Sequence, residues 1–553
     1  DNFEQPFDIN EGMKLILGST AKLRTLAHYL EIVALLYHEF TGMDKNALKE
    51  YNAKDPVTRW TVGRLRQNFD LTEDELLAEA LERSYSANPK EEFFTGGGIH
   101  TFENFRAAHN NKILSVREAT VHSINLVYIR LMRDLVEFHK ARLAYNEKEV
   151  LGNPDDPDRR RLLESLADDE AKYYLYQFYK SYQNLPKDRI LGHLLGNRAA
   201  SANSLAVAFL AWNPGAGEEA LANWLREQKV ILSPEQTRHL FSTYRKPNLS
   251  LADYGFLLRK HPLELWCAGY MLQHSDIKWK KLIEESTEAR GAAYQWLFQP
   301  KMLKAQDIRL RIRIERDAFA RMTPFWQKLG FPFKKLVSSY STAIGSSCDQ
   351  PAALAELIGI ILNDGIRRPA VSLKQIRIGY GTPYHTVLDC SPTLGKQVME
   401  PAVARTLRSV LGAVVEDGTA RRVKGVFVKP DGTPVPVGGK TGTGDNRFKE
   451  FNAKGEVVSS RALNRTATFA FYIADRYFGV ITAFVTGSDA QEYSFTSALP
   501  VNILRLLAPA INSHIAVRSE LETLSRGETG DASPSVSENR PEQNIRGSMS
   551  NIK

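Results

Sequence analysis

Residues Val435–Phe448 read V-P-V-G-G-K-T-G-T-G-D-N-R-F, and this stretch bears most directly on the fold. A glycine-rich run that ends in Lys440 and Thr441 suggests a phosphate-binding P-loop. That loop needs the pattern G-x-x-x-x-G-K-[ST], with a strand before it and a helix after it. Counting back from Gly439, the first glycine position is occupied by Pro434, and the residues after Thr441 are a poor start for a helix. The stretch is therefore not predicted to bind phosphate.

The alternation of Val435, Pro436 and Val437 instead favours a strand that leads into Lys440. K-T-G on a strand is one of three elements that active-site serine enzymes use on penicillin-like bonds, together with S-x-x-K and S-x-N. K-T-G occurs once in the chain, whereas S-x-x-K occurs three times and S-x-N four times. The surrounding sequence therefore has to select the serines.

Ser19 is the candidate nucleophile because it lies where a loop turns into an apolar helix. The apolar residues of this helix recur at helical spacing: Leu23, Leu26, Leu30, Val33 and Leu36. Residues three apart share a helix face, so Lys22 can reach the Ser19 hydroxyl, beside the unpaired N–H groups of the helix N-terminus. Ser275 and Ser550, which open the other S-x-x-K matches, lack this setting. The alternative for Ser19 is ordinary helix capping.

Ser123 and Asn125 form the S-x-N element that is best placed to join this site. Ser115 and Glu118 have the spacing of a capping box, which predicts a new helix that leads through Ser123 into an apolar run. Polar side chains inside an apolar helical stretch need partners, and a catalytic lysine such as Lys22 would supply them. The alternative is capping between two helices.

The bulk composition is that of a large globular protein of several domains. The 553 residues include 72 basic and 64 acidic residues, a formal charge of +8, without a dense Lys/Arg block. We therefore expect no nucleic-acid partner. No apolar run reaches the roughly 18 residues that span a membrane. The cysteines Cys267, Cys348 and Cys390 have no metal-ligand spacing, so neither a metal nor a cofactor is predicted.

The three elements and their flanking residues resemble the transpeptidase domain of the class A (bifunctional) penicillin-binding proteins. The matching segments are Gly18–Lys22, Ser115–Val127, Ala343–Ser347 with Ala352–Gly365, and Gly439–Thr443 with Asp445–Arg447. The resemblance covers roughly residues 1–137 and 320–510. It implies an α+β fold, a mixed α/β sandwich of the penicillin-binding transpeptidase and serine β-lactamase type. A mostly antiparallel sheet would lie between helical layers, with K-T-G on an edge-side strand that faces the helix of Ser19.

The interval between Asn125 and Lys440 is longer than this family usually has, which predicts an insertion. We expect the transpeptidase domain in two parts, 1–137 and 321–512, separated by an all-helical insertion at 138–320. Residues 513–553 are expected to form a disordered tail. We also expect the chain to be the C-terminal part of a class A protein, without its glycosyltransferase region and membrane anchor. Periodicity within the second part predicts helices at 352–362, 401–415 and 501–507, and strands at 376–379, 425–428, 466–473 and 478–485.

The resemblance implies a peptidoglycan D,D-transpeptidase that works through a serine acyl-enzyme on D-Ala-D-Ala. Ser19 would attack, and Lys22 would take its proton once burial and Lys440 had lowered the pKa of Lys22. Ser123 would relay the proton to the departing D-alanine. Asn125 would hold Lys22 and the substrate amide.

The K-T-G strand would bind the substrate. Lys440 would supply positive potential, and the hydroxyls of Thr441 and Thr443 would bind the terminal carboxylate. Gly442 would let the peptide lie against the strand. The backbone N–H groups of Ser19 and Thr443 would form the oxyanion hole.

Two other functions stay open. Water as the acyl acceptor gives a D,D-carboxypeptidase, and a chain that only binds would be a non-catalytic sensor or scaffold of the cell-wall machinery. A β-lactamase is disfavoured because no E-x-x-L-N stretch supplies a deacylation base. The expected partners are stem peptides that end in D-Ala-D-Ala, β-lactams and, through the insertion, cell-wall assembly proteins. Membrane contact is expected only through the missing anchor, on the extracytoplasmic (periplasmic) face of a bacterial plasma membrane.

Overall fold

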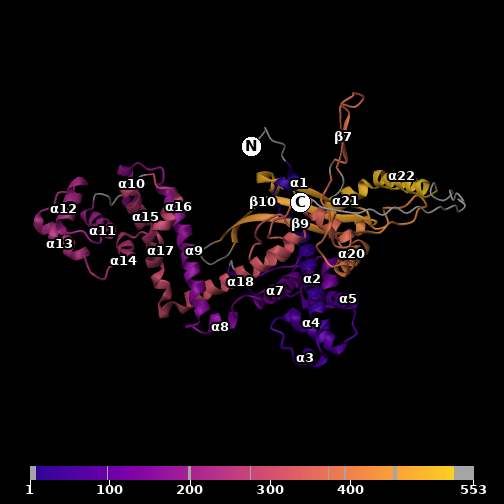
Figure 1. Cartoon of the computed structure of the whole chain (residues 1–553), viewed down its shortest axis with the longest axis horizontal. Coiled ribbons are helices and arrows are strands. Elements are labelled where there is room, and N and C mark those ends of the chain that lie inside the picture. Colours follow the sequence, from indigo (N-terminus) through magenta and orange to yellow (C-terminus); the bar gives the residue numbers. More distant parts are fainter. Residues whose placement is uncertain are drawn as a thin grey trace, which may run out of the picture.

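The computed structural model describes residues 8–527, except 96–97, 197–200, 275, 372, 391–393 and 452–456. The described chain forms a sheet-containing body and a helical module that extends away from it (Figure 1). The helices of the module are α8 Glu147–Gly152, α9 Pro157–Tyr182, α10 Lys187–Leu195, α11 Ala202–Trp212, α12 Glu218–Glu227, α13 Pro234–Tyr244, α14 Leu251–Leu258, α15 Pro262–Gln273, α16 Trp279–Glu285 and α17 Thr287–Tyr294.

The N-terminal part of the body is mostly helical. Its helices are α1 Ile9–Gly12, α2 Ala21–Thr41, α3 Lys45–Glu50, α4 Pro56–Gln67, α5 Glu73–Glu82, α6 Val116–Val121 and α7 Asn125–Lys140. Two short antiparallel pairs accompany them: β1 Ser84–Ser86 with β4 Ile113–Ser115, and β2 Phe93–Thr95 with β3 Gly98–His100. The expected capping box of Ser115 and Glu118 opens α6, with both reciprocal hydrogen bonds present.

The main sheet has the order β11-β10-β9 and is antiparallel throughout its described part. Its strands are β9 Val437–Phe451, β10 Val457–Ile473 and β11 Tyr477–Thr486. β9 lies at one edge of the sheet, and Lys440 pairs with Ala470 of β10. The K-T-G element therefore lies on an edge strand, as expected.

The remaining elements of the body complete the layers around this sheet. They are α18 Leu303–Lys328, α19 Pro351–Leu362, α20 Pro401–Glu416, α21 Ala498–Leu506 and α22 Ala508–Gly527, with the pairs β5 Ile366–Arg367 and β8 Lys396–Gln397, and β6 Gln375–Ile378 and β7 Thr386–Asp389. The β6–β7 hairpin projects from the body (Figure 1).

Alternation along β10 shows how the sheet is sandwiched. Ala470 and Tyr472 belong to the core that α2, α7, α19 and α20 share, whereas Phe469, Phe471 and Ile473 belong to a second core with α21. Successive strand residues point to opposite faces, so each face of the sheet is covered by helices.

One hydrophobic core joins the N-terminal and C-terminal parts of the body. It contains residues between 23 and 138 together with residues between 318 and 472, including Leu26 of α2 and Leu407 of α20. The helical module has two cores of its own, one centred on α11 and α15 and the other on α9 and α17. α18 belongs to both regions, because Ile314 packs with the module and Phe319 with the body. This packing supports our proposal that residues 138–320 form an insertion within one domain.

Three expectations differ from the structure. Residues 425–428 are not a strand, since only Val428 makes an isolated bridge, to Pro434. The expected tail begins too early, because α22 continues to Gly527; residues 528–553 lie outside the described part. Ser123 is not inside a helix. Its φ of 58° interrupts the helical conformation between α6 and α7, and L-residues seldom adopt this left-handed conformation.

Candidate active site

Ser19 lies at the mouth of α2, in the short 3-10 helix Gly18–Thr20 that precedes it. Gly18 has a φ of 57°, and a Cβ built on it would lie 2.1 Å from the carbonyl oxygen of Thr443. Only a glycine allows the Ser19 loop to approach β9 this closely. The fold thereby places the S-x-x-K loop directly against the strand that carries K-T-G.

Lys22 is fully buried one turn beyond Ser19, and its ammonium nitrogen lies at the centre of the site. Lys22 Nζ donates to Ser19 Oγ at 3.0 Å and to Ser123 Oγ at 3.1 Å. It also donates to Asn125 Oδ1 at 2.8 Å and to the Ser123 carbonyl oxygen at 2.7 Å. The ring of Tyr128 lies 5.7 Å away. One lysine thus joins the S-x-x-K and S-x-N elements.

Ser123 and Asn125 are held in the break between α6 and α7. The Ile124 N–H donates to the Ala119 carbonyl oxygen and ends α6, while Asn125 begins α7. Asn125 Nδ2 donates to the Glu103 carbonyl oxygen at 2.8 Å, which leaves its Oδ1 facing Lys22. The positive φ of Ser123 turns its hydroxyl toward both lysines of the site.

Lys440 reaches the same hydroxyl from β9. Its Nζ donates to Ser123 Oγ at 2.9 Å and to the Thr441 carbonyl oxygen at 2.9 Å, and its side chain is fully buried. Burial lowers the pKa of Lys440 to about 7. Burial, and then the charge of Lys440, hold the pKa of Lys22 well below its ordinary value. The lowered pKa favours the neutral form of Lys22, and only this form can accept a proton from Ser19.

Thr441, Gly442 and Thr443 follow along the edge strand. Thr441 is buried, and its hydroxyl lies 2.6 Å from the hydroxyl of Thr419. Thr443 is partly exposed, and its Oγ1 accepts from the Ser497 N–H at 2.9 Å. A hydroxyl that accepts one hydrogen bond can still donate another, so Thr443 has a donor available for a ligand.

A cleft of about 770 Å³ opens over these residues, and Ser19, Ser123, Asn125, Thr441, Gly442 and Thr443 all line it. This volume lies within the range of ligand pockets. The structure therefore brings together every site residue that the sequence nominated. Of the other S-x-x-K serines, Ser275 and Ser550 lie outside the described residues.

The sequence did not point to three residues that support the site. Arg24 is fully buried on α2 and pairs with Asp349, with Nε–Oδ2 at 2.6 Å, and Arg24 also donates to the carbonyl oxygens of Leu329 and Ala353. Thr419 supports Thr441 as described above. The one available signal was a charged residue at position 24, between the apolar positions of a helix.

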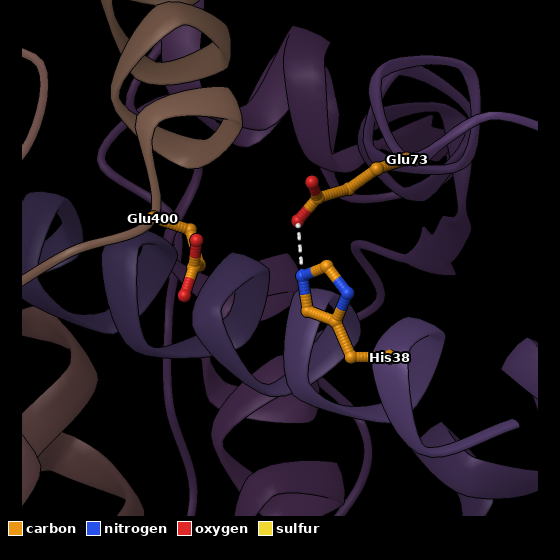
Figure 2. Close-up of side chains that lie close together, drawn as sticks. All are labelled: His38, Glu73 and Glu400. Atoms are coloured by element: carbon orange, nitrogen blue, oxygen red, sulfur yellow. Dashed lines mark ion pairs between the residues drawn. The ribbon is translucent and has the colours of Figure 1, made fainter. Parts of the chain in front are cut away.

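A separate cluster joins α2, α5 and the start of α20 away from the cleft. His38, Glu73 and Glu400 place one ligand atom each within 4.8 Å of the others (Figure 2). His38 Nε2 and Glu73 Oε1 are 3.4 Å apart, which is an ion pair when His38 is protonated. Burial is the largest cause that raises the pKa of Glu73. Since half of the His38 side chain is exposed, we interpret the cluster as a surface interaction that links these helices.

Residues 322–474 match a family described as the penicillin-binding protein transpeptidase domain. The match covers the second part of the body, with α19, α20, β9 and most of β10. Over these residues the chain is similar to the penicillin-binding protein transpeptidase domain, and its fold of mixed helices and antiparallel sheets is the penicillin-binding transpeptidase fold.

The solved structures to which the chain is similar include three bacterial proteins. The D,D-transpeptidase domain of a peptidoglycan glycosyltransferase from Eggerthella lenta is 14% identical, with 91% of this chain and 67% of that chain covered and a TM-score of 0.34. The ceftriaxone acyl-enzyme complex of penicillin-binding protein A from Mycobacterium tuberculosis is 13% identical, with coverages of 90% and 60% and a TM-score of 0.31. Penicillin-binding protein 3 from the same organism, complexed with ampicillin, is 18% identical, with coverages of 37% and 48% and a TM-score of 0.24.

The chain spans about two thirds or less of the length of each of these structures. No curated protein sequence matches the chain. Among the helices that the structure describes, none is both long and apolar enough to cross a membrane.

Proposed function

We propose that the chain is a peptidoglycan D,D-transpeptidase and that Ser19 is its nucleophile, since residues 322–474 match the penicillin-binding protein transpeptidase domain. The observation that carries the proposal is the hydrogen-bonded path from Ser19 through Lys22 to Ser123 and Lys440. A nucleophile within hydrogen-bond reach of a base, which a further group orients, is the arrangement that nucleophilic catalysis requires.

Acylation begins when neutral Lys22 takes the proton of Ser19, whose Oγ attacks the carbonyl between the two terminal D-alanines. The resulting oxyanion lies near the backbone N–H groups of Ser19 and Thr443, and each such donor contributes about 2.7–4 kcal/mol to lowering the barrier. The carbon–nitrogen bond then breaks, and the leaving amine takes a proton from Ser123. Lys22, now protonated and 3.1 Å from Ser123 Oγ, returns a proton to that oxygen.

The K-T-G strand holds the substrate in register with this path. Lys440 contributes positive potential, and the Thr441 and Thr443 hydroxyls receive the terminal carboxylate. A Cβ built on Gly442 would lie 2.2 Å from the Leu17 carbonyl oxygen, so the glycine allows the strand to lie close to the Ser19 loop. An extended peptide can then add to the open edge of β9.

The ester is resolved by an amine of a neighbouring stem peptide, which forms the cross-link. Ser123 or Lys22 accepts the proton that this amine loses. Water in place of the amine gives D,D-carboxypeptidase activity, and the residues that take part are the same. We place the reaction on the extracytoplasmic face of the membrane, where peptidoglycan is assembled.

Acylation by a β-lactam tests this proposal directly. Fluorescent penicillin should label the wild-type chain, and mass spectrometry should find the adduct on the peptide that contains Ser19. Ser19→Ala should abolish the label, while Ser86→Ala, which changes another S-x-N serine outside the cleft, should retain it. Folded wild-type protein that takes no label would instead favour the sensor or scaffold.

We also propose that the helical module is a docking surface for cell-wall assembly proteins. The module extends away from the body in Figure 1, and exposed aromatic side chains, including Tyr173 and Tyr176, lie along α9. The alternative is a structural brace. Deletion of 140–318 that retains labelling by fluorescent penicillin but abolishes partner pull-down would support docking, and an unchanged pull-down would argue against it. A brace predicts lost labelling.

A further inference from the structure

The cleft that contains Ser19 carries three arginines at its mouth. Arg106 lies on the wall next to the S-x-N element, and Arg421 and Arg422 lie on the wall next to K-T-G. All three are exposed, and no ion pair or side-chain hydrogen bond joins any of them to another described residue. Their guanidinium groups are therefore available to a ligand in the cleft.

The first wall is fastened to the site by hydrogen bonds. Asn125 Nδ2 donates to the Glu103 carbonyl oxygen at 2.8 Å, and the Leu126 N–H donates to Asn104 Oδ1 at 3.1 Å. Asn104 Nδ2 in turn donates to Asn110 Oδ1 at 2.9 Å. These bonds fix the loop that carries Arg106 to the residue that also binds Lys22.

The second wall is fastened in the same way. The Thr419 hydroxyl lies 2.6 Å from the Thr441 hydroxyl, and the Thr419 N–H donates to the Val121 carbonyl oxygen at 3.3 Å. The short 3-10 helix Arg421–Val423 follows directly. Arg421 and Arg422 are thus tied to both the K-T-G strand and the end of α6.

Acidic residues do not balance these arginines. Asp417 and Asp445 also line the cleft, but Asp445 already faces Arg447 and Arg465 at 3.4 and 3.5 Å. Asp417 therefore remains against three guanidinium groups. A terminal carboxylate has its own donors on Thr441 and Thr443, so the surplus of positive charge suits another anionic group. Guanidinium groups bind carboxylates by charge-assisted, often bidentate hydrogen bonds.

We propose that Arg106, Arg421 and Arg422 select acyl donors that carry a second free carboxylate, in the part of the peptide that precedes D-Ala-D-Ala. This inference rests on the proposed function, since it places the selected group on the peptide that acylates Ser19. The same residues would disfavour a donor whose second carboxylate has been converted to a carboxamide, because an amide brings no charge to the cleft.

Two synthetic donors test this inference. Both end in D-Ala-D-Ala, and they differ only in whether a preceding side chain ends in a carboxylate or a carboxamide. Release of D-alanine by the wild-type chain should show a kcat/KM roughly tenfold higher for the carboxylate donor, as charge-assisted recognition provides. Arg106→Gln and the double variant Arg421→Gln/Arg422→Gln should each reduce this preference. Arg189→Gln, an exposed arginine of the module, is the matched control and should keep it.

Labelling by fluorescent penicillin separates the two levels of the argument. Equal kcat/KM values for the two donors with labelling intact would overturn the inference alone. A preference for the carboxylate over the carboxamide that appears only when this group is placed on the acceptor peptide, instead of the donor, would overturn the assignment to the donor. A wild-type chain that takes no label would overturn the proposed function and this inference with it. Equilibrium binding of the two donors to Ser19→Ala should show the same preference without turnover.

Discussion

Lys22 and Lys440 donate to the same hydroxyl, with their Nζ atoms 3.1 and 2.9 Å from Ser123 Oγ. Two ammonium groups around one oxygen repel each other, so at least one of the lysines is driven toward its neutral form. Since Lys22 also contacts Ser19 Oγ at 3.0 Å, its neutral form is the one that serves as a base. Ser123, which accepts from both lysines, keeps its own proton for the leaving amine.

Ser123→Ala should slow acylation strongly without removing the nucleophile. Loss of a group that transfers a proton in the transition state typically costs a factor of about 10²–10⁴. We therefore expect fluorescent penicillin to label the variant completely but at a rate lower by about this factor. The rate is measured from labelling reactions that are quenched at a series of times. Circular dichroism of the variant controls for folding, because Ser123 has a φ of 58°. An unchanged labelling rate would show that Ser123 relays no proton.

The rate of acylation should fall as the pH rises through about 7. Lys440 has a pKa of about 7 and is charged below it; its loss of charge removes positive potential from the carboxylate site and raises the pKa of Lys22. The first effect weakens binding of the carboxylate, and the second leaves Lys22 protonated more of the time, so that it accepts the Ser19 proton less readily. The second-order rate constant for penicillin acylation, measured from pH 5.5 to 9, should show this fall as an alkaline limb of the pH profile.

Lys440→Arg is the variant that isolates this effect, because a guanidinium stays charged over the whole range. We expect the alkaline limb to move upward in pH or to disappear. Since a buried arginine alters packing, Lys440→Gln serves as a second variant, with a low rate at every pH and no limb near 7. An alkaline limb that stays near pH 7 in both variants would assign it to another group.

Local patterns were enough to place two of the three elements, S-x-x-K and K-T-G, on their secondary structures. The 3.6-residue period after Ser19 predicts α2, and the alternation before Lys440 predicts β9, because each depends only on neighbouring residues. The antiparallel pair of β10 and β11 was predicted for the same reason. The structure then brings these elements into one cleft, which periodicity alone does not dictate.

Features that depend on distant pairing or unusual backbone could not be predicted. The partner of Arg24 is Asp349, and nothing near either residue indicates the other. The Thr419–Thr441 contact is of the same kind. Ser123 looked helical because the residues around it are, whereas its left-handed backbone is imposed by the junction of α6 and α7. Residues 425–428 have an apolar pattern but no partner strand beyond one bridge.

Arg24→Ala should destabilise the body by about 3–5 kcal/mol, because it leaves Asp349 as a buried charge without a partner. Urea unfolding measures the loss. Arg64→Ala is the matched control: its pair with Glu79 is partly exposed, so the expected cost is at most about 1 kcal/mol. Equal costs for the two variants would show that the buried pair adds no more to stability than the surface one.

Acid should weaken the junction between α2 and α7 through a buried pair of histidines. His28 and His139 are both buried, with their Nε2 atoms 3.1 Å apart, and Phe325 of α18 stacks on His28. Burial is the main cause that lowers the pKa of His139 to about 3 and the pKa of His28 well below its ordinary value. A histidine in the unfolded chain titrates near pH 6.5, as unperturbed histidines do.

The sign of the effect follows from these values. Above about pH 6.5 neither state binds the proton, and the contribution of the pair to stability is fully present. Below about 6.5 the unfolded chain binds protons that the folded chain excludes, so the free energy of unfolding falls by up to about 1.4 kcal/mol per pH unit for each histidine. His28→Gln/His139→Gln should therefore lose less stability between pH 7.5 and 5 in urea unfolding than the wild type does. His38→Gln, which removes a half-exposed histidine, should lose as much as the wild type, and equal losses in all three proteins would show that the buried pair does not govern the acid response.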